Sequence, residues 1–484
     1  MKRFVVLALF CAGNAINEMM QLTFSPIFGS TQAVFGVSAA SATLLPTLYL
    51  IAFAPSALAL SLLRTRWGLR SCLLLGSSVQ AVGACLRWAA CAMPSQPAAF
   101  PLLATGQLLA ALAQPVYTNL PAVLSTTWFA APSRALATVV ATLANPIGNA
   151  LGSVVPGLVV PEVPSGGSPA AAAAALAHLT LAQALVALLV LAATWGLVED
   201  MPAIAPSVAA ALRRTQRSGE QDDPAAALLQ PPAEELTDVD AAAAAAASAP
   251  SPSAWTAMLR DFSALLSNAN FLRLLLGFGV GLGAFNALLA LLGQLLAPCG
   301  YKPSVAGLAG GAMLATGLFS AIGAGLALRA TGAFVPALRI GICCASAGMV
   351  GFLLALRPGN AAALLSASAV LGAAAVPLLP LTLENAAEAT YPTPEDSSAA
   401  LLTSAGKLLG VVFVAALQPL AAASTCTSVL TPAAGVVVGA MAVAALGLLS
   451  FRVDYRRTAL ERSAVAAAAG VEAEAEAAGK GGGE

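Results

Sequence analysis

The chain has 484 residues, of which 59% are hydrophobic and only 9% are charged. Soluble domains carry about a quarter charged residues, so this composition excludes a soluble enzyme. The 22 basic and 22 acidic residues give no net charge, which argues against a basic nucleic-acid-binding surface.

The apolar residues form stretches of about 20 or more, long enough to cross about 30 Å of hydrocarbon as helices. In chain order we predict spans at 4–28, 39–63, 71–93, 100–127, 134–160 and 174–198. After a polar segment, six more follow at 271–296, 304–328, 335–356, 361–383, 399–422 and 431–451. The sequence therefore predicts an all-α membrane protein with twelve transmembrane helices.

Two polar segments divide the chain, and neither has the composition to form a core. We predict a charged, partly disordered cytoplasmic linker at 199–268 and a partly disordered cytoplasmic tail at 452–484. The helices then form an N-terminal half, 1–198, and a C-terminal half, 269–451. The basic loops at Arg64 and Arg329 lie 265 residues apart, close to the offset of 267 between the first and seventh spans. This constant offset indicates that the two halves are pseudo-symmetric copies of one six-helix unit.

The basic residues predict the orientation, because Lys and Arg near span ends stay on the cytoplasmic side. With both termini inside, 18 of the 22 are cytoplasmic, while Lys302 and Arg357 face outward and Arg87 and Lys407 fall within spans. We expect an integral multi-pass protein of the plasma membrane or an internal membrane, with both termini in the cytoplasm.

Polar residues recur at spacings of three and four along the first span: Asn14, Asn17, Glu18 and Gln21. Such spacings place them on one helical face, which would be costly against lipid. We interpret this face as the lining of a cavity, with Glu18 as a candidate proton carrier. The alternative is a hydrogen bond between helices made by a protonated glutamate.

Two further spans carry polar residues. Gln107 and Gln114 lie two turns apart on one face of the fourth span. Lys407 lies about eight residues into the eleventh span, or about 12 Å deep at 1.5 Å per residue. A buried ammonium costs about 3 kcal/mol on insertion scales. Lys407 therefore either contacts an anionic solute or a carboxylate such as Glu18 or Glu384, or snorkels to the interface.

Proline and glycine mark the fifth span, where Asn145 and Pro146 predict a helix break because proline removes a backbone donor. Gly148 and Gly152 provide a small face for close packing, and a simple packing kink is the alternative. At the cytoplasmic end of the tenth span, Glu384 and Glu388 stand one turn apart.

These two glutamates predict a gate, because they could pair with Arg64, Arg66 or Arg134 across the two halves. A solvated helix end is the alternative. The eight cysteines lack the spacing of a metal site. Cys299 and Cys426 fall in outward loops, where one disulfide could form. We expect no metal and no cofactor.

Two six-helix halves joined by a long charged linker resemble the major facilitator superfamily, whose halves rock about a site near the midplane. Over most of both halves, the residues resemble the family of the feline leukaemia virus subgroup C receptors, including its major facilitator domain-containing 7 and disrupted-in-renal-carcinoma 2 branches. The resemblance rests on Asn17, Phe24-Ser25-Pro26, Tyr49, Pro55, Gly68-Leu69-Arg70, Gly106-Gln107, Trp128-Phe129, Arg134, Asn145-Pro146-x-Gly148, Leu288-Leu289, Gln294, Gly311 and Glu384-x-x-x-Glu388-x-x-Tyr391-Pro392.

This resemblance implies alternating-access transport of a small organic solute, within a range that includes choline, ethanolamine, haem and pyridoxine-like vitamins. The choline-transporting members have a tryptophan where this chain has Gln21, and glutamines where it has Pro146 and Lys407. A quaternary ammonium needs aromatic faces, so these departures argue against choline. Lys407 favours an anionic or zwitterionic solute.

We therefore expect the substrate cavity to be lined by Asn17, Glu18, Gln21, Tyr49, Gln107, Gln114, Asn145, Phe285, Asn286, Gln294 and Lys407. We expect gating residues at Arg64, Arg66, Arg134, Arg329, Glu384 and Glu388, although Thr65 and Arg329 stand where loops of the superfamily commonly hold an aspartate. The expected function is monomeric solute transport, with proton coupling and without catalysis. The alternative is a non-transporting membrane receptor or solute sensor of the same fold.

Overall fold

The computed structural model describes residues 2–164, 166–199, 254–331, 333–390, 393, 395–422, 426 and 431–452. The first part of the chain, called the N half below, contains α1 (Lys2–Leu22), α2 (Phe28–Phe35), α3 (Ala39–Ala92), α4 (Ala99–Asn119), α5 (Pro121–Trp128), α6 (Ala131–Val159) and α7 (Ala170–Leu197). A separate helix, α11 (Ala254–Ser267), follows. The C half contains α12 (Ala269–Leu296), η1 (Ala297–Cys299), α13 (Pro303–Thr331), α14 (Phe334–Ala355), α15 (Ala361–Ala375), α16 (Leu378–Thr390), α17 (Glu395–Ala422) and α18 (Pro432–Ser450).

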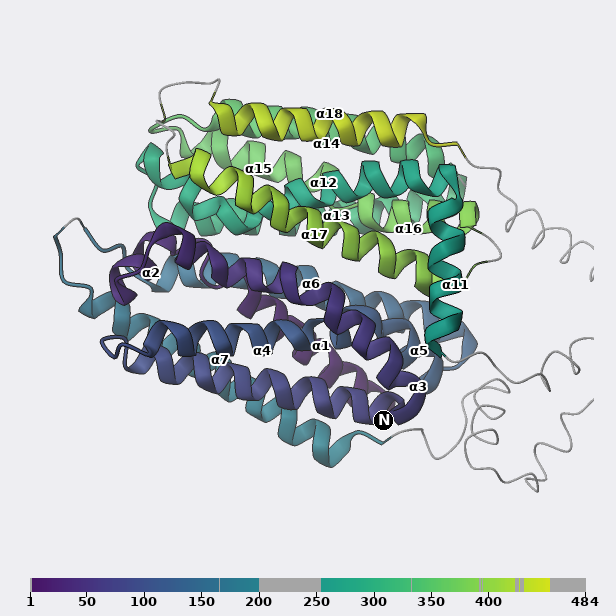
Figure 1. Ribbon diagram of the computed structural model, residues 1–484, viewed down its shortest axis with the longest axis horizontal. Helices are drawn as coiled ribbons and strands as arrows, with labels where there is room; N and C mark the ends of the chain where they lie inside the picture. The colour runs from purple at the N-terminus through teal and green to yellow at the C-terminus, as the bar shows by residue number, and fades with distance from the viewer. Residues whose placement is uncertain are drawn as a thin grey trace, which may run out of the picture.

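The helices form two layers that lie side by side along the long axis of the molecule (Figure 1). Twelve stretches of the described chain are long and apolar enough to cross a membrane. The predicted fold class, an all-α protein with twelve membrane-spanning helices, is confirmed. The division into a linker and a tail with the predicted boundaries stays a prediction, because 200–253 and 453–484 lie outside the described residues. Within the predicted linker, α11 is helical and packs against α3, α12 and α17.

Two predicted spans, 39–63 and 71–93, both lie in α3 and join at Gly68. Gly68 has φ of 80°, a region that glycine enters without a steric penalty because it lacks Cβ. The chain therefore reverses here without a longer loop. At the start of α3, the Ser38 hydroxyl accepts a hydrogen bond of 3.2 Å from the amide of Ser41, which caps the helix.

The helix break predicted at Pro146 and Gly148 is wrong, because α6 runs without interruption from Ala131 to Val159. One proline removes a single helical donor, and the rest of α6 packs closely along α1, which holds the helix together. The fourth span is interrupted instead: α4 ends at Asn119 and α5 begins at Pro121. Proline is favoured at the first position of a helix, where its missing N–H is not needed.

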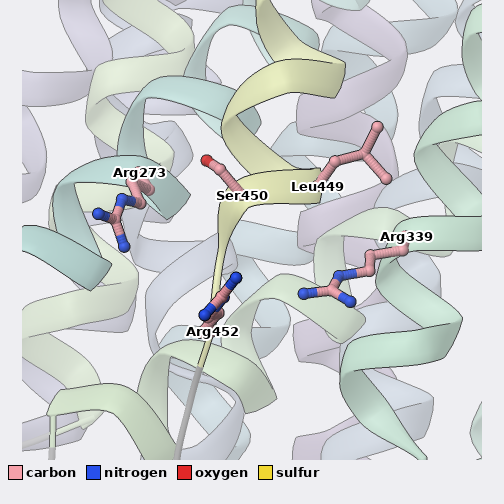
Figure 2. Close-up of a pocket in the computed structure, with 5 residues that line it drawn as sticks. All are labelled: Arg273, Arg339, Leu449, Ser450 and Arg452. Atoms are coloured by element: carbon pink, nitrogen blue, oxygen red, sulfur yellow. The ribbon is translucent and has the colours of Figure 1, made fainter.

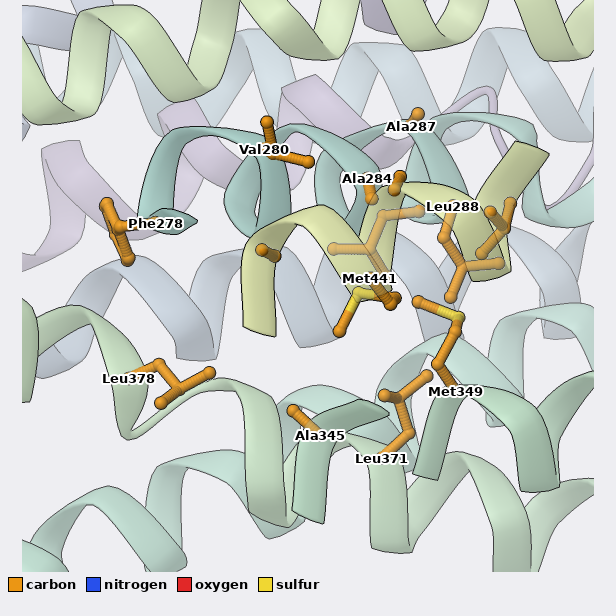
Figure 3. Packing of buried hydrophobic residues seen from close by; sticks show 14 of the residues in the cluster. Phe278, Val280, Ala284, Ala287, Leu288, Ala345, Met349, Leu371, Leu378 and Met441 are labelled. Atoms are coloured by element: carbon orange, nitrogen blue, oxygen red, sulfur yellow. The ribbon is translucent and has the colours of Figure 1, made fainter. Parts of the chain in front are cut away.

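The C half packs around buried apolar side chains that several of its helices contribute (Figure 3). Ala284 and Leu288 of α12 lie close to Met349 of α14, Leu371 of α15 and Met441 of α18, and all five are less than 10% exposed. Lipid tails are as apolar as these side chains, so removal from water does not hold the helices together. Dispersion contacts between closely packed atoms stabilise this core instead.

A disulfide and an ion pair mark the two opposite ends of the bundle. At the disulfide end, Cys299 after α12 and Cys426 before α18 form a disulfide with their Cα atoms 5.0 Å apart. At the linker end, Lys2 and Glu199 form an ion pair with an N–O distance of 2.6 Å. The α11 helix crosses this end beside both layers (Figure 1).

The free energy of unfolding of the Cys299→Ser variant is expected to be lower by about 2–5 kcal/mol, because a disulfide reduces the conformational entropy of the unfolded chain. The bridge closes a loop with a sequence separation of 127, so the entropic effect should be large. The measurement is the thermal unfolding midpoint of purified protein without reductant. Cys343→Ser is the matched control, since Cys343 is a free and exposed thiol. Equal midpoints for Cys299→Ser and the parent would contradict the expected result.

Candidate functional site

A buried carboxylate on α1 lies among three amide side chains. Glu18 is 1% exposed. Its Oε1 accepts hydrogen bonds from Gln114 Nε2 at 2.9 Å and from Asn145 Nδ2 at 2.6 Å. Its Oε2 accepts from Asn149 Nδ2 at 2.8 Å. An amide can present either its oxygen or its NH₂ group, so these neighbours can satisfy both an ionised and a protonated glutamate.

Glycines bring α6 close enough to α1 for these contacts. A Cβ on Gly148 would collide with the backbone carbonyl of Ala15, and one on Gly152 with that of Met19. The two helices therefore approach backbone to backbone, with Asn145 and Asn149 facing Glu18. Gly148 and Gly152 thus serve close helix packing, as their small-residue spacing predicted.

A cation from the other half completes this group. Lys407 of α17 donates from Nζ to Gln114 Oε1 at 3.1 Å. Its ammonium also lies 5.0 Å from the centre of the Phe53 ring on α3, within cation–π range. Lys407 therefore points into the protein between the halves, and the snorkelling alternative is wrong. The reason is that Gln114 and Phe53 supply polar and aromatic partners at that depth.

Gln114 connects the two opposite charges. Its oxygen accepts from Lys407 while its nitrogen donates to Glu18 and, at 2.5 Å, to Gln21 Oε1. Lys407 and Glu18 also attract each other electrostatically. We call Glu18, Gln21, Gln114, Asn145, Asn149 and Lys407 the polar centre.

Other predicted cavity residues make hydrogen bonds within the N half. Asn17 Nδ2 donates at 2.9 Å both to Gln80 Oε1 and to the carbonyl of Ala110. The Tyr49 hydroxyl donates to the Asn17 carbonyl at 3.2 Å. Gln107 Nε2 donates to the Met20 carbonyl at 3.2 Å, and all three predicted residues are fully buried. These bonds join α1, α3 and α4 next to the polar centre.

The other predicted C-half residues, all on α12, are divided between two places. Phe285 is partly buried and packs against the C-half core. Asn286, also on α12, has a buried Nδ2 without a hydrogen-bond partner in the described part of the chain. Gln294 lies near the disulfide end, where it accepts from Thr43 Oγ1 at 3.2 Å and donates to the Gln418 carbonyl at 3.0 Å.

The halves are in close contact at the disulfide end. The Ser25 hydroxyl donates to the Leu289 carbonyl across the halves. A Cβ on Gly293 of α12 would collide with the Ser25 carbonyl, and a Cβ on Gly157 of α6 would lie 2.5 Å from the Pro303 carbonyl. Gln294 therefore belongs to the contact that closes this end rather than to the polar centre.

The predicted gating residues stand at the linker end. Arg134 donates from Nε to the Phe129 carbonyl at 3.1 Å. On α16, Glu388 is buried and Glu384 is exposed. Arg64 is partly buried in α3. The structure does not describe the side chains of Arg66 and Arg329. Pairing of these charges across the halves stays a prediction.

Sequence patterns did not predict Asn149 and Phe53 as part of the site, and they gave no role to Arg87. Asn149 follows Asn145 by four residues, so helical spacing could have placed both on the face towards Glu18. Arg87 is 1% exposed, and its guanidinium lies 5.2 Å from the centre of the Phe24 ring. Its Nη2 donates to the Met20 carbonyl at 3.4 Å, while Nε and Nη1 find no partner among the described residues.

Comparisons with known proteins agree with this fold. A model of the Major Facilitator Superfamily matches residues 9–444. Solute carrier family 49 member A3 of Xenopus tropicalis is 26% identical over 429 residues, covering 87% of this chain and 78% of that protein. Choline/ethanolamine transporter FLVCR1 of Felis catus is 27% identical over 416 residues, covering 86% of this chain and 67% of that protein. These matches confirm the family resemblance that the motifs predicted.

One solved structure with the same fold is the D-xylose-proton symporter. It superposes with a TM-score of 0.66 and covers 94% of this chain and 99% of its own, at 14% sequence identity. At this level of identity the likeness shows the fold alone.

Proposed function

Because this chain belongs to the Major Facilitator Superfamily, we propose that it is an alternating-access transporter whose solute binds at the polar centre. The observation that carries the proposal is the meeting of Glu18 from the N half and Lys407 from the C half at one amide, Gln114. A site formed by both halves near mid-membrane can open to either side as the halves rock. The proposed unit is a monomer with a six-helix half on each side of this site.

The chemistry of the polar centre supports an anionic or zwitterionic solute. Lys407 would donate to a carboxylate or phosphate of the solute in place of Gln114 Oε1, in a charge-assisted hydrogen bond. Glu18 would accept from a solute ammonium in place of an amide donor. A single aromatic ring, that of Phe53, lies under the Lys407 ammonium, and the lysine itself occupies the place of a cation. This arrangement favours zwitterionic, amino-acid-like solutes over choline.

Proton coupling is proposed through Glu18. The carboxylate is held by three amides that can each turn to accept as well as donate, so it can gain and lose a proton without losing its neighbours. Protonation would remove the charge that attracts Lys407 and thereby change how strongly the halves hold together. The proposed orientation has the linker end in the cytoplasm, since the basic residues gather there. In that orientation the contacts at the disulfide end close the outward side.

Purified protein in liposomes is expected to take up at least one member of a panel of labelled amino alcohols, amino acids, vitamins and organic anions. A proton gradient directed into the liposomes, with the outside more acidic than the inside, should speed uptake by the parent. It should leave uptake by Glu18→Gln unchanged, because glutamine carries no titratable proton. Glu199→Gln is the control, since Glu199 lies on the surface in an ion pair with Lys2.

Two results would each contradict a different part of the proposal. Uptake of no member of the panel would exclude transport and favour a receptor or sensor of this fold. An identical pH response of Glu18→Gln and the parent would exclude the proton role while leaving transport intact.

A further inference from the structure

A second polar site lies at the linker end of the C half, away from the polar centre. A cavity of about 460 Å³ is lined by Arg273, Arg339, Leu449, Ser450 and Arg452. Its volume lies within the range of small-molecule sites, about 300–1,000 Å³. Figure 2 shows the Arg452 guanidinium between those of Arg273 and Arg339. We call this cavity the arginine pocket.

Three helices bring these arginines to one level. Arg273 is four residues past the start of α12, and Arg339 is five residues past the start of α14. At 1.5 Å per residue both lie about 6–8 Å from their helix ends. Arg452 is two residues past the end of α18, which packs against both helices. The arginine pocket therefore lies where these helices leave the hydrocarbon, at the depth of lipid headgroups.

Two of the guanidinium groups are held in place before any ligand binds. Arg273 donates from Nη1 to Asn270 Oδ1 at 2.9 Å, and Arg339 donates from Nη2 to the Phe451 carbonyl at 2.9 Å. The Nε of Arg339 is buried and has no hydrogen-bond partner in the described chain. A buried donor without a partner is costly, which indicates that an acceptor belongs there.

The charge of the arginine pocket fits a phosphate group. None of its five lining residues is acidic, so three positive charges face one cavity. Arginine presents several N–H donors in a fixed plane that matches the oxygens of phosphate. The shared chemistry of any fitting ligand is therefore a phosphate monoester or diester.

The surroundings of the pocket favour a lipid as the source of this phosphate. Exposed apolar side chains lie within six residues of the arginines in the sequence: Leu272, Leu276, Ile340, Leu446 and Leu449 are between 40% and 69% exposed. In an integral membrane protein such side chains face acyl chains. Basic pockets between helices on the cytoplasmic side bind phosphorylated lipid headgroups. We propose that the arginine pocket binds the phosphorylated headgroup of an anionic lipid in the leaflet at the linker end.

Lipid binding to the purified full-length protein in phosphatidylcholine nanodiscs tests this proposal, with phosphatidylinositol phosphate as the added probe. A surface arginine contributes about fivefold to anionic-lipid binding. The variant Arg273→Gln/Arg452→Gln is therefore expected to bind the probe about 25-fold more weakly. Both side chains are exposed, and neither holds another helix, so this variant should fold.

Arg357→Gln is the matched control, because Arg357 is an exposed arginine at the disulfide end. It should bind the probe as the parent does, while Arg339→Lys should bind it more weakly than the parent, because lysine keeps the charge but lacks the buried Nε donor and the planar fork of arginine. Equal binding by the double variant and the parent would overturn the proposal. So would release of the lipid probe by millimolar inorganic phosphate, which would identify a free anion as the ligand.

Discussion

Lys407→Gln is expected to lower solute uptake at least tenfold and to lower the stability of the protein. A charge-assisted hydrogen bond contributes about 1.5–3 kcal/mol, which corresponds to about 10- to 150-fold in solute affinity. Removing one member of a buried charge pair costs about 3–5 kcal/mol, because the other charge stays buried without compensation. Glu18 keeps three amide donors in this variant, so the loss of stability should fall near the lower value.

A second substitution separates the two effects. In Lys407→Gln/Glu18→Gln both charges are gone, so stability should return towards that of the parent while uptake remains low. The measurements are the thermal unfolding midpoint in detergent and initial uptake rates in liposomes. Lys302→Gln is the control, because Lys302 is exposed near the disulfide end. Unchanged uptake by Lys407→Gln would remove this residue from the binding site. A double variant as unstable as the single one would show that the two charges are not paired.

Gly148→Ala is expected to lower both stability and uptake. The added methyl group would lie 2.8 Å from the Ala15 Cα and would collide with the carbonyl of that residue. Backbone atoms cannot move aside as a flexible side chain can, so α6 must shift away from α1. Overpacking of this kind costs about 1–3 kcal/mol, and sometimes more. The shift would also carry Asn145 and Asn149 away from Glu18, so uptake should fall even in molecules that remain folded.

Gly323→Ala provides the matched comparison, since a Cβ at Gly323 of α13 would meet nothing within 4 Å. Alanine is the better helix former by about 1 kcal/mol, so this control should be as stable as the parent or more stable. Thermal unfolding and uptake are measured on both variants under the same conditions. Gly148→Ala with parental stability and uptake would mean that the approach of α1 and α6 is not needed for the site.

The membrane spans could be predicted from sequence because the thickness of the bilayer fixes how long an apolar helix must be. The face of α1 with Glu18 could be predicted too, because residues three or four apart always share a side of a helix. Contacts between residues on helices that are far apart in the sequence could not be predicted. The contacts of Glu18 with Gln114 and of Gln114 with Lys407 join segments 96 and 293 residues apart in the sequence.

The effect of each proline was equally hard to predict, because it depends on neighbouring helices. Pro146 lies in a helix that packs along α1, and that helix continues. Pro121 begins a new short helix after Leu120. Both prolines look alike in sequence, and only the packing around them distinguishes a tolerated residue from a break. The inward direction of Lys407 depends in the same way on Phe53 and Gln114, which no local pattern connects to it.

The disulfide joins two connections of the same half, the one after α12 and the one between α17 and α18. It therefore does not cross between the halves, and it links the end of α12 covalently to the connection between α17 and α18 within the C half. The end of α12 then cannot separate from the α17–α18 connection while the disulfide is intact. Opening at this end would instead require the contacts between the halves to separate, among them the hydrogen bond from the Ser25 hydroxyl to the Leu289 carbonyl.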